Sequence, residues 1–600
     1  MGYRIKLMLA MLPLLGACGE STPESQSTAS VDPAVALQAS LTGLEAGELP
    51  ELPTHWIHPG DIGNGEGPVT SAHLAAGTAD AKQWLLYGGD YANTRHSPIT
   101  ELNPEAVRDM RVAWAFATGT LGQFEVSPVI YDGIMYITSS HNRLFALDPT
   151  SGKLYWRYDH QQPDDLKICC GPANRGVGIS GDLVLMATLD ARLLAFNRKT
   201  GELVWNVELA PYIDGFSATS APLIVNDMAI IGIAGGEFGV RGFFDAYDVG
   251  TGERLWRHYT VPAEGEFGAD TWAGDSYKSG GAPAWTSGAY DPDTDTLFWT
   301  TGNPSPDWNG DLRAGDNLFS DTLLAIDPNT GERKWHFQFT PHDVWDYDGN
   351  TQIFLVDVTR DGETIKAIVQ PNRNGYFYII NRSTGEFIAA TPYVEELNWA
   401  TIDENGRPVV NPNAFPVEEP TFRVCPGNLG GMNGAWTGAL NPELGLAYIP
   451  VVEACQMFQK GIVAFVKGQP FMGGQPLITD IDEGRAHGHL SAVDINTGEV
   501  RWRYMDVHSM MGGVLSTAGG VVFTGNQRGY ALALDAASGE VLWKFKMGGG
   551  VRSQPVAYQI DGRTFVAIGS GNWNTLAAFS GGPDDIPEGG HLFVFELPQG

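Results

Sequence analysis

A repeated pattern that ends in tryptophan limits the folds open to this 600-residue chain. The pattern Ala-x-(Asp/Asn)-x-x-(Thr/Ser)-Gly-x-x-x-Trp occurs six times, in segments that start at Ala146, Ala195, Ala246, Ala325, Ala492 and Ala533, with weaker copies at Ala289 and Ala439. The Asp or Asn and the following Thr-Gly or Ser-Gly pair are turn residues, so each copy predicts a β-hairpin between two short apolar strands. The closing Trp is a large flat group suited to packing between neighbouring sheets.

The spacing of the repeats predicts a β-propeller. Trp156, Trp205 and Trp256 lie 49 and 51 positions apart, which is the length of one four-stranded blade with extended loops. A ring of such sheets leaves few exposed strand edges. The wider interval from Trp335 to Trp502 is expected to hold blades with degraded repeats and long loops. The 75 glycines, the 37 prolines and the lack of long amphipathic patterns predict an all-β chain with few helices.

The first residues have the build of a secretory signal peptide. Two cations, Arg4 and Lys6, precede an apolar run over residues 7–15, which is too short to remain in a bilayer as a spanning helix. The sequence Leu-Gly-Ala-Cys that ends at Cys18 resembles the lipobox of bacterial lipoproteins, which implies cleavage before Cys18 and lipidation of its thiol. Plain cleavage after Ala17, with an unmodified cysteine, is the alternative.

These features predict three parts of the chain. A lipoprotein signal peptide occupies residues 1–17, a lipid-anchored tether and N-terminal extension residues 18–67, and the propeller residues 68–600. The residues that follow Cys18 are rich in Ser, Thr, Pro and Glu, which is typical of a disordered tether. We expect the body of the protein to face the periplasm of a bacterial cell envelope, held at the outer membrane by its lipid.

Charge and cysteine content exclude some classes of function. The formal net charge of −33 argues against nucleic acid as a partner, because phosphates require a basic face. Apart from Cys18, the four cysteines Cys169, Cys170, Cys425 and Cys455 permit two disulfides in three pairings in an oxidising compartment. The Cα atoms of the two adjacent cysteines are only about 3.8 Å apart, so a bond between them would be strained, and strain clusters at functional sites. No Cys-x-x-Cys-His motif occurs, so the chain carries no covalent c-type haem of its own.

A long stretch of the chain resembles one enzyme family. From "WLLYGGDYANTRHSPI" at residue 84 to "GSGNWNTLAAF" at residue 569, it is similar to the methanol and ethanol dehydrogenases that depend on pyrroloquinoline quinone (PQQ), tryptophan-docking motifs included. The resemblance implies an eight-bladed β-propeller with PQQ near its central axis. PQQ is a flat orthoquinone with three carboxylates, so its site needs flat apolar faces, in-plane donors and a cation.

The resemblance also implies which residues hold the cofactor. A disulfide between Cys169 and Cys170 would cover one face of PQQ and Trp285 the other. Arg175 matches a cofactor-binding arginine, whose planar fork suits a carboxylate, and Arg373 matches the arginine that supports the quinone oxygens. Six further residues fall on cofactor positions: Glu125, Thr219, Gly235, Gly236, Asn433 and Trp573. Cys425 and Cys455 match a second, structural disulfide of the family.

Four residues match metal ligands of the family: Glu237, Asn303, Asp346 and Asp348. Oxygen ligands imply a hard cation. Asp346 also matches the catalytic base of the family, which takes the hydroxyl proton of the alcohol. In an extended segment Asp346 and Asp348 would share a face and reach one ion. An Asp at the second position marks lanthanide-using members of the family. Three carboxylates beside a neutral Asn therefore favour a trivalent lanthanide, with Ca²⁺ as the alternative.

The implied activity is oxidation of alcohols, primary alcohols above all, to aldehydes. Asp346 would take the hydroxyl proton, and PQQ would accept a hydride. A separate c-type cytochrome would then accept the electrons. Two other functions stay open: a PQQ dehydrogenase for a polyol, sugar or polyether alcohol, and a non-catalytic outer-membrane propeller lipoprotein that serves as a scaffold. The oligomeric state also stays open, with a homodimer as one option. Met511 departs from the family, where many members have a Trp near the cofactor, so we expect different packing there.

Overall fold

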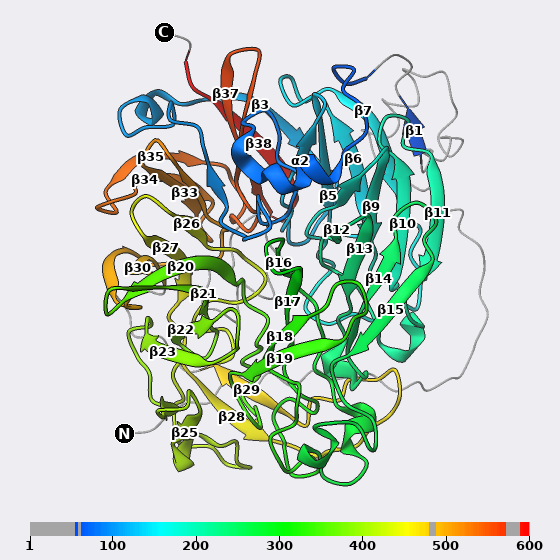
Figure 1. The fold of residues 1–600 in the computed structure, drawn as a ribbon, viewed down its shortest axis with the longest axis vertical. Coiled ribbons are helices and arrows are strands. Elements are labelled where there is room, and N and C mark those ends of the chain that lie inside the picture. The colour runs from blue at the N-terminus through cyan, green and yellow to red at the C-terminus, as the bar shows by residue number, and fades with distance from the viewer. Residues whose placement is uncertain (1–54, 58–61, 479–487, 572–587, 599–600) are drawn as a thin grey trace, which may run out of the picture. The chain divides into compact units, whose positions relative to one another are not determined.

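The computed structural model describes residues 55–57, 62–478, 488–571 and 588–598 (Figure 1). The predicted signal peptide, the predicted lipidation site at Cys18 and the predicted cofactor residue Trp573 therefore lie outside the described residues. In the described ranges the one α-helix is α2 (Ser71–Ala76), and no helix is long and apolar enough to cross a bilayer. Short 3-10 helices occur in the loops: η1 (Gly77–Ala79), η2 (Ala106–Asp109), η3 (Tyr212–Asp214), η4 (Gly236–Phe238), η5 (Ala269–Thr271), η6 (Ser276–Ser279) and η7 (Pro412–Ala414).

Strands make up the rest, and eight sheets of at least four strands form an eight-bladed β-propeller, as the sequence predicted. The first four sheets contain β4 (Val129–Tyr131), β5 (Ile134–Ser139), β6 (Arg143–Leu147) and β7 (Leu154–Asp159); β8 (Gly178–Ser180), β9 (Leu183–Ala187), β10 (Arg192–Asn197) and β11 (Leu203–Glu208); β12 (Leu223–Val225), β13 (Met228–Gly232), β14 (Phe243–Asp248) and β15 (Arg254–Tyr259); and β16 (Ala289–Asp291), β17 (Thr296–Thr300), β18 (Thr322–Ile326) and β19 (Arg333–Gln338). In each of these sheets neighbouring strands are antiparallel, so short turns connect them.

The next three sheets include those whose repeats are degraded. They contain β20 (Phe354–Arg360), β21 (Glu363–Pro371), β22 (Tyr376–Asn381) and β23 (Phe387–Pro392); β26 (Ala439–Asn441), β27 (Leu446–Val452), β30 (Gly488–Asp494) and β31 (Val500–Asp506); and β32 (Leu515–Thr517), β33 (Val521–Gly525), β34 (Tyr530–Asp535) and β35 (Val541–Lys546). Two extra hairpins lie in the interval predicted to hold long loops, one of β24 (Ala400–Ile402) and β25 (Pro408–Val410), the other of β28 (Gln456–Lys460) and β29 (Gly474–Ile478).

The eighth sheet joins the two ends of the propeller. Its strands β36 (Val556–Ile560), β37 (Arg563–Ser570) and β38 (His591–Glu596) come from the C-terminal part, whereas β3 (Arg111–Ala117) comes from before the first blade and pairs antiparallel with β38. Figure 1 shows the blue β3 beside the red strands of this sheet. Two more early strands join other sheets: β1 (His55–Ile57) pairs with β7, and β2 (His96–Ser97) pairs in parallel with β32.

The tryptophan of one blade packs on a turn glycine of the next. Trp256 donates its indole N–H to the carbonyl of Pro328 at 2.8 Å, and a Cβ atom added to Gly331 would lie 2.7 Å from the indole ring. Equivalent contacts join Trp114 to Gly152, Trp205 to Gly252, Trp335 to Gly385 and Trp502 to Gly539. The repeat therefore carries both halves of the contact between blades, the ring and the space that receives it.

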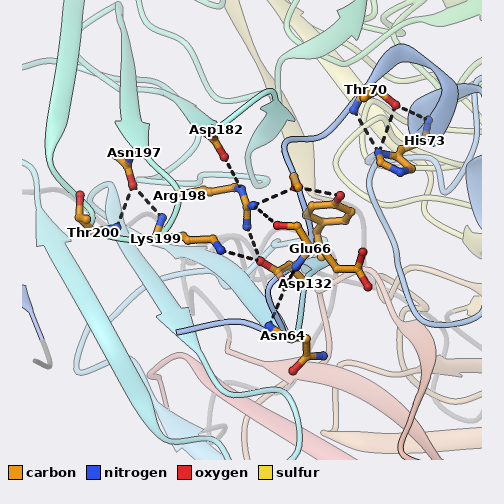
Figure 2. A network of polar contacts seen from close by, with 12 residues as sticks. Asn64, Glu66, Thr70, His73, Asp132, Asp182, Asn197, Arg198, Lys199 and Thr200 are labelled. Atoms are coloured by element: carbon orange, nitrogen blue, oxygen red, sulfur yellow. Dashed lines mark hydrogen bonds and ion pairs between the residues drawn. The ribbon is translucent and has the colours of Figure 1, made fainter. Parts of the chain in front are cut away.

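Arg198 fastens the segment before the first blade to the propeller (Figure 2). Its buried guanidinium donates to Asp132 at 2.8 Å, to Asp182 at 3.1 Å and to the carbonyl of Glu66 at 3.0 Å. Asp132 also accepts the backbone N–H groups of Asn64 and Glu66, at 2.7 and 2.8 Å. Part of the predicted N-terminal extension therefore packs on the blades.

Replacement of a docking glycine tests the contact between blades. Gly331 has φ of 74° and meets the Trp256 ring, whereas Gly265 has φ of 83° and no atom within 4 Å of an added Cβ. Both Gly331→Ala and Gly265→Ala should lose about 1–2 kcal/mol because alanine disfavours this backbone region. Gly331→Ala should lose about 1–3 kcal/mol more because it overpacks the indole. Equal losses in denaturant or thermal unfolding would refute the docking role.

Candidate active site

Loops that precede the first strands of several blades bring the predicted cofactor residues together. Glu125, Thr219 and Trp285 each lie four residues before the first strand of their blade, β4, β12 and β16. Arg175 lies three residues before β8 and donates its backbone N–H to the carbonyl of Thr219 at 3.0 Å. Residues far apart in the sequence are thus neighbours, because each of these blades has its loop at the same position before its first strand.

The two adjacent cysteines form a disulfide, as the resemblance implied. Cys170 has φ of 64°, and its carbonyl accepts the side-chain amide of Gln123 at 2.7 Å. Its Sγ atom lies 3.6 Å from Oε1 of Glu237. The disulfide therefore borders a predicted metal ligand. The second predicted disulfide, Cys425 with Cys455, is also present.

Glu125 holds two arginines in a buried cluster. Its carboxylate lies 2.8 Å from Nη2 of Arg175 and 3.2 Å from Nη1 of Arg552. Arg175 also donates to the hydroxyl of Thr219 at 2.7 Å. Two guanidinium groups beside one carboxylate leave an excess positive charge. The Nε atoms of Arg175 and Arg552 have no hydrogen-bond partner among the described residues. This end of the site fits the carboxylates of PQQ.

Trp285 connects that cluster to the predicted metal ligands. Its ring centroid lies 4.9 Å from Cζ of Arg175, and its indole N–H donates to Oδ1 of Asp348 at 3.2 Å. The loop of Asn433 lies against the same ring, because a Cβ atom added to Gly434 would come within 2.9 Å of it. Asn433 itself is buried and accepts the backbone N–H of Ala435 at 2.9 Å.

The segment that carries Asp346 and Asp348 is not extended, so that prediction is wrong. Both residues are left-handed, with φ of 60° and 50°. The carboxylate of Asp343 accepts the N–H groups of Trp345 and Tyr347, both at 2.8 Å, and this local turn replaces strand geometry. The two aromatic side chains are fully buried and alternate with the two carboxylates.

Arg373 nevertheless reaches both carboxylates. Its Nη1 lies 2.7 Å from Oδ2 of Asp348, and its Nη2 lies 3.5 Å from Oδ2 of Asp346. The Nε atom donates to the carbonyl of Asn428, whose side-chain amide donates to Oδ2 of Asp346 at 3.1 Å. Asn428 is thus a site residue that sequence reasoning missed.

Glu237 and Asn303 complete the predicted metal ligands. Glu237 lies in η4, which follows Gly235 at φ of 117°, where a Cβ atom would meet the carbonyl of Gly215 at 2.2 Å. Asn303 donates its backbone N–H to Oδ1 of Asp348 at 3.1 Å, and a Cβ atom added to Gly236 would come within 3.0 Å of Pro283. Glycine at both positions thus lets the η4 loop pack against its neighbours.

Neighbouring carboxylates influence the pKa values of Glu237 and Asp346. Burial, with a smaller effect of the Asp348 charge, raises the pKa of Glu237 to about 7. Burial also raises the pKa of Asp346 well above its usual value; Arg373 opposes this shift, whereas Asp348 and Glu237 add to it. The side chains predicted to bind the metal, Asn303 included, offer oxygen atoms, which suit a hard cation. Among the described residues, the carboxylates of Glu237, Asp346 and Asp348 are not within 4.8 Å of one another as a set of three.

Met511 and Arg552 follow the same positional rule as the cofactor residues. Met511 lies four residues before β32 and Arg552 four residues before β36. Met511 is fully buried, and its sulfur lies 2.9 Å from Nη2 of Arg552. Arg552 was missed from the sequence, although its spacing from the next strand could have revealed it.

Comparison with known proteins identifies the family. Residues 84–406 match the family described as glucose/ethanol/alcohol dehydrogenase, beta-propeller domain. The quinoprotein alcohol dehydrogenase PedH of Pseudomonas putida is 39% identical over 580 residues, which cover 88% of this chain and 96% of PedH. The chain belongs to the PQQ-dependent quinoprotein alcohol dehydrogenases.

Other known proteins are also similar to this quinoprotein. The lanthanide-dependent methanol dehydrogenase of Methylacidiphilum fumariolicum is 34% identical over 540 residues, 85% of this chain and 88% of that protein. A solved europium-containing methanol dehydrogenase superposes with a TM-score of 0.83 at 32% identity and covers 88% of this chain and 100% of its own. Residues 486–582 also match the family described as outer membrane protein assembly factor BamB.

The raised pKa values predict proton-linked metal binding. Because burial raises the pKa of Glu237 to about 7 and that of Asp346 well above its usual value, we expect a cation bound by these two groups to displace protons. Affinity for La³⁺ should therefore fall as the pH is lowered below about 7, by about tenfold per pH unit for each proton displaced. Chelator-buffered titrations measure this slope, and Glu237→Gln should flatten it. An affinity independent of pH would contradict the assignment of these ligands.

Proposed function

We propose that this quinoprotein oxidises primary alcohols to aldehydes on the periplasmic side of a bacterial envelope. The observation that carries the proposal is the half-buried Asp346 carboxyl group, which lies 3.5 Å from Nη2 of Arg373 and accepts the side-chain amide of Asn428 at 3.1 Å. A general base for an alcohol must lie within hydrogen-bond reach of the hydroxyl proton, and a carboxylate can fill this role. Asp346 is proposed to accept this proton.

PQQ, when bound, supplies the two-electron acceptor, and the cation beside it supplies Lewis acidity. The Glu125 cluster is proposed to bind the cofactor carboxylates through Arg175 and Arg552. The disulfide of Cys169 and Cys170 and the ring of Trp285 are proposed as its flat apolar contacts, with Thr219, Gly235, Gly236, Asn433 and Trp573 at its edges. Arg373 is proposed to orient Asp346 and Asp348 and to support the quinone oxygens.

The cation is proposed to be a lanthanide ion, with Ca²⁺ as the alternative. Asp348 adds a third carboxylate to Glu237 and Asp346, so the donor set carries the charge that suits a trivalent ion. Two relatives whose names state a lanthanide or europium support the choice. Because the sequence has no haem-attachment motif, the electrons are proposed to leave singly to a separate c-type cytochrome.

Reconstitution tests the activity directly. The purified protein is mixed with PQQ and either La³⁺ or Ca²⁺, and dye reduction is followed across primary alcohols, secondary alcohols, polyols and sugars. We expect turnover of primary alcohols. A best substrate among the polyols or sugars would replace the proposed substrate class, whereas no turnover and no quinone absorbance with either ion would favour a scaffold.

Two variants separate the roles of the paired aspartates. Asp346→Asn should lower kcat by about 10²–10⁴-fold, because it removes the base. Asp348→Ala should weaken La³⁺-dependent turnover more than Ca²⁺-dependent turnover, because it removes one of the charges that suit a trivalent ion. Asp357→Ala is the matched control, since that side chain is exposed and pairs with Arg382 at 3.7 Å on the surface. Equal losses with both ions in Asp348→Ala would contradict the lanthanide assignment.

The membrane anchor is tested separately from the chemistry. If Cys18 is lipidated, radiolabelled palmitate should label the full-length wild type, and the protein should fractionate with the outer membrane. Cys18→Ala should abolish both while reconstituted activity is retained. An unlabelled wild type would show that the cleavage is that of an ordinary signal peptide.

A further inference from the structure

A cavity of about 470 Å³ is lined by none of the predicted cofactor or metal residues. Its apolar wall consists of Leu312, Phe465 and Phe471, together with Pro306 and Ala273. The rings of Phe465 and Phe471 meet edge to face, with their centroids 5.2 Å apart. A concave space of this size with apolar walls is typical of a site for a small organic ligand.

The charged groups in the wall of this cavity are paired with other groups. Asp275 pairs with Lys278 at 2.8 Å, and Asp311 pairs with Lys460 at 2.5 Å. The guanidinium group of Arg313 donates to two backbone carbonyls and to one side-chain oxygen. The remaining lining residues are glycine or serine. Because each of the three charged groups already has a partner, the cavity suits an uncharged ligand.

One wall of the cavity packs directly on η4, the segment that carries Glu237. The backbone N–H of Phe471 donates to the carbonyl of Glu237 at 2.6 Å. A Cβ atom added to Gly239 would lie 2.9 Å from the ring of Phe471 and 3.0 Å from the ring of Phe465. Ser305, also in the wall, donates its hydroxyl to another carbonyl of η4. The cavity and the predicted metal ligand are therefore on neighbouring segments.

Another wall contacts the turn that carries Asp346 and Asp348. Arg313 donates a guanidinium N–H to the carbonyl of Asp343, the residue whose carboxylate organises this turn. Asp346 and Glu237 are both half-buried, so each keeps some exposure. The cavity thus adjoins the place where Asp346 is proposed to take the proton of an alcohol.

The segment between β28 and β29 exposes apolar side chains next to the cavity. Residues 462–466 read Ile-Val-Ala-Phe-Val, and Ile462, Phe465 and Val466 are 92%, 47% and 58% exposed. Leu312 is 58% exposed. A run of exposed apolar residues of this length is unusual unless it has a function. Because Phe465 and Leu312 both line the cavity and reach solvent, they mark its mouth.

We propose that this cavity holds the hydrocarbon part of the substrate, so that the enzyme prefers primary alcohols with a long or aromatic apolar chain. The inference rests on the proposed function, since the hydroxyl group would point to Asp346 while the chain lies against Leu312, Phe465 and Phe471. These three residues would determine specificity without touching the reacting atoms. Each methylene group that leaves water for such a wall should raise kcat/KM by up to about fourfold.

The experiment measures kcat/KM of the protein reconstituted with PQQ and La³⁺ for straight-chain primary alcohols from ethanol to octanol. The value should rise with chain length until the cavity is filled. Leu312→Ser and Phe465→Ser should lower kcat/KM for octanol by about 5–10-fold and for ethanol by a smaller factor. Leu444→Ser is the matched control, because it makes the same change at a side chain that is 44% exposed and lies outside the cavity lining.

A second measurement does not depend on turnover. A tertiary alcohol with an octyl chain has no hydrogen on the carbon that carries the hydroxyl group, so it cannot be oxidised to a carbonyl compound. Calorimetry of the same protein with this alcohol should show binding with a negative heat-capacity change, the mark of buried apolar surface. Leu312→Ser should weaken this binding, whereas Leu444→Ser should bind as the wild type does.

The other outcomes count against the inference. A kcat/KM that does not rise with chain length would overturn it, as would tertiary-alcohol binding that Leu312→Ser leaves unchanged. Equal losses for ethanol and octanol in Leu312→Ser would show a structural defect and would also overturn it. In each of these cases ethanol is still oxidised, so the proposed function stands. A protein that oxidises no alcohol would refute the proposed function, and the substrate role of the cavity with it.

Discussion

The pairing of β3 with β38 is the constraint on which the rest of the structure depends. The eighth sheet takes one of its four strands, β3, from the other end of the chain, and this pairing ties the last blade to the segment before the first. Closure leaves each blade with two neighbours, so each docking tryptophan has a turn to meet. It also directs the loops before the first strands toward one another, and these loops carry the active-site residues.

Much of this arrangement could be predicted from the sequence because the repeat encodes it. The turn residues, the tryptophan and the receiving glycine lie within one short pattern, as at Gly331. The same periodicity could have gone further, since Met511 and Arg552 occupy the position of Glu125 and Trp285 in their own blades. What the pattern could not supply was the conformation of Asp346 and Asp348, because the left-handed turn depends on Asp343 and on two buried aromatic rings. Nor did any motif point to Asn428, which reaches Arg373 and Asp346 through tertiary contacts alone.

The site has two ends of opposite charge, and this polarity explains the otherwise costly burial of so many ionisable groups. One end has an excess positive charge, on Arg175 and Arg552 around Glu125. The other end has an excess negative charge, on the carboxylates around Arg373. Each buried charge of this kind costs several kcal/mol unless it is matched. Within each end the ion pairing is incomplete, and at the carboxylate end protons offset part of the negative charge, because burial raises the pKa values of Glu237 and Asp346.

Such incomplete pairing is the expected preparation for a ligand that carries the missing charges. A flat anion would complete the arginine end, and a hard cation would complete the carboxylate end. Trp285 joins the two, because its ring faces Arg175 while its indole N–H holds Asp348. The disulfide of Cys169 and Cys170 borders Glu237 and has no titrating group of its own, so it adds a surface without adding charge. A bond between adjacent cysteines therefore suits this place for a physical reason: it offers an apolar surface between the hydrophobic core, against which Cys169 packs, and the Glu237 carboxylate.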